Sequence, residues 1–357
     1  MKSILLKLLP RSIKELAKKC LSTFSILTVK LFSINGFTAS IYYLILDRSF
    51  YREHKASLLG RLSFQKKLKQ VDNSSALLRR NIHRLEKGLI MRPRRASFAE
   101  AYVLETVEVF ILAVQTKGFC KKELKWATDV LQKYFEVVED QGRISLARAT
   151  FATTNEPVSG NHSKAKSVPY SHASLPAPSV EFEELTQLYT RRRSVRWYQD
   201  RQVEKKSLEK AVNSASLAPS ACNRQPFFFN YTADGALASN IAELAMGTVG
   251  FAGNIPALIV VVGDLSNYPS ERDRHVIYID ASLAAMQLML ALETLGLSSC
   301  PINWPDVESR ERLMQNKLGL QYFERPIMLI AVGYAMPAGE IPFSQKKSAD
   351  MLLKEIL

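Results

Sequence analysis

The sequence predicts an α+β protein built from two different parts. Residues 1–150 carry apolar side chains at three- and four-residue spacing, which is typical of helices. Residues 181–357 combine such segments with short runs of Val, Ile and Phe bounded by Gly and Pro, which is typical of strands. Residues 151–180 are rich in Ser, Pro, Asn and Ala, with few large apolar side chains to bury. We therefore expect an all-helical domain, a flexible linker and a mixed domain, in that order.

The charge of the chain is unevenly distributed. The 357 residues have a net charge of +14, yet residues 1–180 hold 30 Lys and Arg against 14 Asp and Glu, and residues 181–357 hold 18 against 20. This asymmetry predicts an anionic partner for the front half, such as a phospholipid surface or an acidic polysaccharide, unless it is simply a Lys-rich outer face. We expect no nucleic-acid partner, because the chain has no zinc-finger spacing and no basic helix followed by a leucine heptad.

The first 46 residues leave three interpretations open. Residues 1–19 mix Leu and Ile with Lys and Arg, as an amphipathic helix does, and Leu31 to Leu46 is a run of 16 uncharged residues. A spanning helix needs about 20 such residues. Residues 20–46 could form a transmembrane helix, an interfacial helix or a buried core helix. With four scattered cysteines and no CxxC pair, the sequence favours a cytoplasmic protein. The basic helical front leaves open whether the protein is held peripherally at the inner membrane face.

Three further helices are expected in the front part. Residues 74–91 repeat apolar side chains around Leu78 and Ile82, and the polar side chains between them indicate a solvated or interhelical face more than a catalytic one. Residues 97–116 open with Ser97 and Glu100 at capping-box spacing, and residues 121–139 form the last helix. In the C-terminal part, we expect helices at 181–192, 206–217, 237–246, 279–296 and 306–318, and strands at 227–231, 257–263 and 327–333.

The residues around 191–225 suggest a cofactor. Arg191, Arg192, Arg193 and Arg196 surround Ser194, and fork-shaped guanidinium donors suit a phosphate. Farther along, amide side chains could read a heterocycle through paired donors and acceptors. The chain has no GxSxG elbow, P-loop, HExxH or metal-ligand spacing. We expect a bound cofactor to carry the chemistry, with no metal involved.

The motifs resemble those of one known family. "RRSVRWY", followed by "APSACNRQPF", "DASLAAMQLMLALETLGLSSCPINWPD", "IMLIAVGYAMP" and "FSQKKSADMLL", is similar in content and order to the FMN-dependent nitroreductases over residues 181–357. The resemblance implies a nitroreductase-like fold, a central antiparallel sheet flanked by helices. It also implies FMN as cofactor, NADH or NADPH as reductant, and a homodimer with two composite sites.

The resemblance also assigns residues to the site. Arg192, Arg193, Ser194 and Arg196 would contact the FMN phosphate and ribityl chain. The loop that reaches the flavin of the partner subunit would be Pro219, Ser220, Ala221 and Asn223, with Gln225 in support. The backbone N–H of Asn303, after Pro301, would approach flavin N5, and Trp304 stands where many members have Gly. Lys346 and Lys347 would form the closing basic pair, and no side chain is implied as an obligatory acid or base.

The implied activity is a ping-pong oxidoreduction. Hydride would pass from NAD(P)H through flavin N5 to a small organic acceptor, nitroaromatic or quinone-like. The alternatives are a membrane-associated flavin-binding scaffold and a pathway-specific flavin dehydrogenase linked to cell-surface polysaccharide assembly.

Overall fold

The computed structural model describes residues 10–154 and 165–356, and these divide into two units. The N-terminal unit ends at His54, and the main unit begins at Lys55. Each unit is described by itself.

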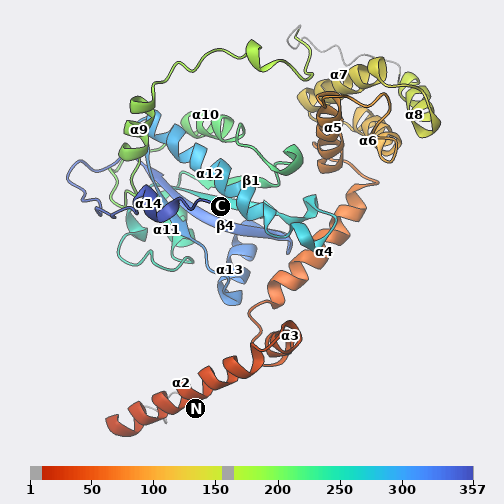
Figure 1. The fold of residues 1–357 in the computed structure, drawn as a ribbon. Helices are drawn as coiled ribbons and strands as arrows, with labels where there is room; N and C mark the ends of the chain where they lie inside the picture. The colour runs from red at the N-terminus through yellow and green to blue at the C-terminus, as the bar shows by residue number, and fades with distance from the viewer. Residues whose placement is uncertain (1–9, 155–164, 357) are drawn as a thin grey trace. The chain divides into compact units, whose positions relative to one another are not determined.

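The N-terminal unit contains two helices separated by a capped break. Helix α2 spans Arg11–Phe32 and α3 spans Gly36–Ile45 (Figure 1). A third helix, α4 (Tyr51–Lys67), begins in the last residues of this unit. Asn35 is the N-cap of α3. Its side chain accepts from Thr38 N at 3.0 Å and the Thr38 hydroxyl accepts from Asn35 N at 3.3 Å, which is a capping box. A single helix over residues 20–46 is therefore not what forms.

The apolar side chains of this unit are exposed. No residue of α3 is buried, and the exposed side chains of α2 include Phe24, Leu27 and Leu31. The interpretation of residues 20–46 as a buried core helix is therefore wrong for the single chain. The segment 1–9 of the predicted amphipathic helix lies outside the described residues.

The helical region of the main unit, residues 55–154, has its own apolar core. Helices α5 (Ala76–Leu89), α6 (Val103–Gln115), α7 (Lys121–Val137) and α8 (Gly142–Ala152) pack around Leu78, Ile82, Val107 and Leu131. The predicted start of the second helix at Ser97 is wrong. Ala99 has a φ of 66°, outside the helical region, so the helix begins only at Val103. Helix α8 was not expected, and its last residues enter the predicted linker, of which 155–164 are not described.

The sheet region of the main unit, residues 182–356, contains four strands. They are β1 (Phe227–Thr232), β2 (Ala257–Asp264), β3 (Ser298–Asn303) and β4 (Glu324–Gly333), in the order β1-β2-β4-β3. Every neighbouring pair is antiparallel, which confirms the α+β class with an antiparallel sheet. Strand β3 was not predicted. It lies at the edge of the sheet, where Pro301 is tolerated because an edge strand has one unpaired side.

Helices cover both faces of the sheet (Figure 1). Ile259, Val261 and Ile330 point into one core, which also contains residues of α10 (Lys205–Ala215) and α12 (Val276–Thr294). Leu258, Val260 and Leu329 point into the other, which contains residues of α11 (Gly235–Ala242) and α13 (Glu308–Leu318). This alternation follows the two-residue period of a strand. The remaining helices are α9 (Phe182–Arg191), α14 (Ala349–Leu352) and the 3-10 turns η1 (His172–Ser174), η2 (Ala221–Asn223), η3 (Ala252–Asn254), η4 (Leu265–Asn267) and η5 (Glu271–Asp273).

Helix α12 is the centre of the sheet region. Among the described helices, the stretch Glu271–Thr294 is the one long and apolar enough to cross a membrane by length and composition, and 44% of its window is buried in the protein. Ala281, Ala284 and Leu288 are fully buried in the core against the sheet. A core position explains its apolar composition. The apolar helix α3 is shorter.

Candidate functional site

The arginine segment, residues 191–196, runs from the end of α9 onto the edge strand β3. Ser194 and Ser299 form a parallel bridge, and Val195 N donates to Ser299 O at 3.1 Å. Two apolar anchors hold the segment there. Val195 and Tyr198 are buried, and the Tyr198 hydroxyl donates to Val195 O at 2.6 Å. The backbone thus fixes where the arginine side chains begin.

Polar groups converge beside β3 with part of their hydrogen-bonding capacity unused. Arg192 Nε and Ser299 Oγ are buried, and neither has a hydrogen-bond partner among the described residues. Buried donors are rarely left unpaired in a folded protein. Arg192 and Arg196 both lie close enough to Cys300 to lower the pKa of its thiol, although burial dominates and raises that pKa. The Cys300 thiol is therefore neutral and does not offset the positive charge of the two arginines.

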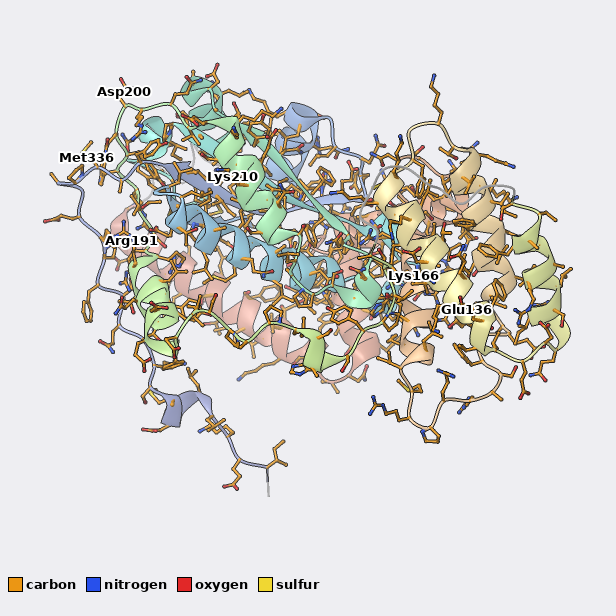
Figure 2. All side chains as sticks on the ribbon, turned by 90° about the horizontal axis from the view of Figure 1, so that it is seen from above. Glu136, Lys166, Arg191, Asp200, Lys210 and Met336 are labelled. Atoms are coloured by element: carbon orange, nitrogen blue, oxygen red, sulfur yellow. The ribbon has the colours of Figure 1, made fainter. Side chains whose placement is uncertain are left out.

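Arg193 and Arg191, unlike Arg192 and Arg196, are engaged by groups outside β3. Arg193 Nη2 donates to Pro342 O at 3.0 Å and also to Phe343 O, so its guanidinium holds the C-terminal tail. Arg191 lies 3.5 Å from Glu293 at the end of α12 and is mostly exposed. Figure 2 shows Arg191 and Met336 at the same end of the sheet region. Lys346 and Lys347 follow in the tail and are both exposed.

On β3, the predicted flavin-facing positions alternate with core positions. Pro301 and Asn303 are exposed, whereas Ile302 and Trp304 are buried. The Trp304 indole Nε1 donates to Glu311 Oε1 at 3.0 Å inside the core. The structure therefore leaves Asn303 exposed at the end of β3 but does not present the Trp304 ring for stacking.

The η2 loop, residues 219–225, has an unusual backbone. Cys222, Asn223 and Gln225 have φ values of 53°, 52° and 51°, in the left-handed region that non-glycine residues seldom adopt. Three contacts over-determine this conformation: Ala221 N donates to Asp280 Oδ2 at 2.9 Å, Gln225 N donates to Ser220 Oγ at 3.1 Å, and Gln225 Nε2 donates to Ser216 O at 2.6 Å. Strain of this kind persists where surrounding structure enforces it and is concentrated at functional sites.

The helical region also holds this loop, through a residue that the sequence did not single out. Arg79 of α5 donates from Nε to Asn223 O at 2.8 Å and from Nη2 to Gln225 Oε1 at 3.0 Å. Its Nη1 donates to Glu123 of α7 at 3.2 Å, and the Glu123 side chain is only 3% exposed. The polar stripe on the helix at 74–91 was the available signal, and its interhelical interpretation is correct for Arg79.

One chain does not bring the predicted site residues together. The η2 loop bonds Asp280 near the start of α12, whereas the arginine segment meets Glu293 at its end. At the usual rise per residue, these positions are about 20 Å apart along the helix. The two groups of residues therefore occupy opposite ends of the same helix.

Known proteins match this part of the chain. The model of the nitroreductase family matches residues 189–251 and 243–334. An Archaeoglobus fulgidus protein provisionally named NADH dehydrogenase/NAD(P)H nitroreductase is 33% identical over 152 residues, 42% of this chain and 84% of the relative. Iodotyrosine deiodinase 1 of Mus musculus is 23% identical over 216 residues, 52% of this chain and 75% of the relative.

Solved structures match as well. An FMN-dependent nitroreductase of Clostridium difficile is 26% identical, with a TM-score of 0.38, over 44% of this chain and 91% of that chain. A Parabacteroides distasonis protein provisionally named NADH dehydrogenase/NAD(P)H nitroreductase is 27% identical, with a TM-score of 0.42, over 48% of this chain and 96% of that chain.

Sequence motifs and relatives together define the class of the sheet region, an oxidoreductase domain. The chain belongs to the nitroreductase family.

Proposed function

We propose that the protein is an FMN-dependent oxidoreductase that passes electrons from NADH or NADPH to a small organic acceptor. The observation that carries the proposal is the convergence of Arg192, Ser194 and Arg196 on β3, with Arg192 Nε and Ser299 Oγ buried and unpaired. These donors fit the oxygens of a phosphate. When bound there, FMN would supply two-electron chemistry at N5, which no described side chain provides.

The residues would have separate tasks around the cofactor. Arg192 and Arg196 would bind the phosphate, and Ser194 and Ser299 would add hydroxyl donors. Asn303, which is exposed at the end of β3, would present its backbone N–H to the reacting ring. Arg193 would act indirectly, because it holds the tail that carries Lys346 and Lys347.

A homodimer would complete the site. The η2 loop and the arginine segment lie at opposite ends of α12, so a second copy is the simplest way to bring both to one flavin. Helix α12 also exposes Ile279, Leu283 and Met286 at 58%, 44% and 38%, on one helical stripe. Apolar stripes of this kind are typical of interfaces between subunits.

The reaction would use the same face of the site twice. The nicotinamide would bind, reduce the cofactor and leave, and a nitroaromatic or quinone-like acceptor would take its place. The residues of this chain would position both partners and exclude side reactions. Reductive dehalogenation is the second candidate activity, because some relatives of this chain are named iodotyrosine deiodinase.

The spectrum of the purified protein tests this proposal. We expect a yellow protein that releases FMN on denaturation, is bleached anaerobically by NADH or NADPH, and regains colour with a nitroaromatic or a quinone. Arg192→Ala together with Arg196→Ala should remove most of the bound FMN. The matched control is Arg201→Ala with Arg312→Ala, which removes the same charge from exposed positions elsewhere.

A colourless protein that does not take up added FMN would overturn the proposal. Full FMN occupancy in the double variant would show that the phosphate lies elsewhere. An FMN-loaded protein that neither NADH nor NADPH reduces would instead support the scaffold, which binds flavin without turnover. Comparing 3-iodotyrosine with a nitroaromatic as acceptor separates the two candidate activities.

We also propose peripheral attachment of the N-terminal unit to an anionic membrane. Its described part exposes Phe24, Leu27 and Leu31 on α2 and Phe37 on α3, and Lys19 and Lys30 lie exposed on α2. Apolar side chains beside basic ones suit the boundary between acyl chains and anionic headgroups. This supports the interfacial interpretation of residues 20–46, and we propose that the attachment is on the cytoplasmic side.

Flotation with vesicles tests the attachment. The full chain should float with vesicles of phosphatidylserine and phosphatidylcholine, and less with phosphatidylcholine alone. Phe24→Glu with Leu27→Glu should abolish flotation, whereas Leu146→Glu, at an exposed position of α8, should not. A wild-type chain that stays at the bottom of the gradient at low salt would contradict the proposal.

A further inference from the structure

A cavity lies in the helical region, and none of the predicted flavin contacts lines it. Its volume is about 440 Å³, and its lining includes Arg84, Arg92, Arg95, Phe98 and Tyr102. We call it the arginine cavity. Small-molecule sites typically have volumes of 300–1,000 Å³. Three guanidinium side chains line this one, and its described lining contains no acidic side chain.

The wall of the arginine cavity is fixed by contacts that orient Arg84. Its guanidinium lies 3.6 Å from the centre of the Tyr102 ring, and Nη1 donates to Asn81 Oδ1 at 3.4 Å. Asn81 is fully buried and donates in turn to Glu105 at 3.1 Å. The guanidinium is therefore positioned before any ligand arrives, which reduces the entropy cost of binding.

An aromatic wall closes the other side. Phe98 packs directly on helix α5, because a Cβ at Gly88 would lie 2.3 Å from its ring. Phe98 is held from behind by Tyr134, whose ring lies edge-on at 5.0 Å and whose hydroxyl donates to Phe98 O at 2.6 Å. Only glycine at position 88 allows this wall. The cavity thus combines a rigid apolar face with positive groups.

Positive charge continues from the cavity toward the η2 loop. Arg80, one turn before Arg84 on α5, is half-buried and has no hydrogen bond or ion pair among the described residues. Burial lowers the pKa of Arg80, the guanidinium groups of Arg84 and Arg224 lower it further, and the Glu105 carboxylate acts in the opposite direction. Cys222 of the η2 loop is also near enough to act on it. Arg80 thus extends the positive charge of the cavity one turn along α5 toward the η2 loop.

We propose that the arginine cavity binds a phosphate or carboxylate group of the electron acceptor, whose remainder extends past Arg80 toward the η2 loop. The part of this inference that concerns the acceptor rests on the proposed flavin site. The three guanidinium groups of the cavity would attract an anion, which would accept their fork-shaped donors. Phe98 would contact the apolar part of the same ligand.

Calorimetry tests the anion site without turnover. The flavin-loaded full chain is titrated with inorganic pyrophosphate and, separately, with citrate, so that the two arms distinguish phosphate from carboxylate. We expect at least one to bind, and Arg92→Ala or Arg95→Ala to weaken it about tenfold. Both side chains are exposed, so the variants should fold. Arg84→Lys keeps the charge but loses the fork and should also weaken binding.

Arg143→Ala is the matched control, because Arg143 is an exposed arginine of the same region outside the cavity. It should bind both anions as the wild type does. Failure of the wild type to bind either anion would overturn the inference. Unchanged affinity in Arg92→Ala and Arg95→Ala would do the same.

Steady-state kinetics tests the link to the acceptor. With 4-nitrobenzoate, KM should rise severalfold in Arg92→Ala and Arg95→Ala, while nitrobenzene, which lacks the carboxylate, should give wild-type values. Equal effects on both acceptors would overturn the acceptor assignment. The absorption spectrum distinguishes a failure of the anion site from a failure of the proposed flavin site. A colourless protein whose anion binding depends on Arg95 refutes the flavin proposal and supports the anion site.

Discussion

At the scale of single residues, one buried charge pair supports the end of β3. Arg325 and Glu311 have side chains only 2% and 1% exposed, and Arg325 Nη2 donates to Glu311 Oε1 at 3.0 Å. The same carboxylate accepts from Trp304. A buried ion pair contributes little compared with an apolar replacement, but removing one partner is costly. Glu311 therefore holds the strand that carries Asn303.

We expect Glu311→Gln to destabilise the protein by about 3 kcal/mol, because Arg325 then keeps only the exposed carboxylate of Asp306 as a counter-charge. Urea unfolding, followed by tryptophan fluorescence, measures the change. Glu308→Gln breaks an exposed pair with Arg312 on the same helix and should cost under about 0.5 kcal/mol. Equal losses for the two variants would contradict a special role for the buried pair.

At the scale of elements, helix α5 acts as a support for the η2 loop. Arg79 bonds the loop backbone, the loop amide and Glu123 of α7 with one guanidinium. A lysine could not reach all three, because only the planar fork presents donors in fixed directions. The strained loop and the helical region are therefore one structural assembly.

Replacement of Arg79 by Met should loosen the loop. It removes three donors and leaves the buried Glu123 carboxylate without its charged partner, so we expect a loss of about 2–4 kcal/mol. Faster amide exchange at residues 221–225 should accompany the loss. Arg79→Met with Glu123→Gln should recover part of the stability, since the stranded charge is then absent. No recovery would mean that the two residues act independently.

Much of the element order could be predicted, because periodicity and strand composition are local properties. The helices at α5, α7 and α12 and the strands β1, β2 and β4 follow from these patterns. Strand β3 could not be found, since it contains Pro301 and forms through pairing with the distant β4. Ser97 has the correct spacing for a cap, but the left-handed Ala99 prevents the helix from starting there. The hydrogen bonds of Arg79 to the η2 loop depend on packing between the helical region and the sheet region, which local sequence does not encode.

At the scale of the whole molecule, the exposed stripe on α12 gives a prediction about assembly. Leu283→Glu places a charge on this stripe, so light scattering should report a monomer, and FMN content should fall because the η2 loop of the partner is lost. Leu313→Glu, at a 53% exposed position on α13, should leave both unchanged. A dimer of Leu283→Glu with full FMN content would place the interface on another surface.

The Arg79 contact has a further consequence for how two ligands would influence each other. It joins helix α5, which contributes Arg84 to the arginine cavity, to the loop expected to reach a flavin. If an anion in the cavity favours the conformation in which Arg79 is bonded to the η2 loop, it raises the affinity for FMN by some factor. Thermodynamic reciprocity then requires FMN to raise the affinity for the anion by that same factor. Anion titrations of the apoprotein and the flavin-loaded protein would measure this coupling free energy directly.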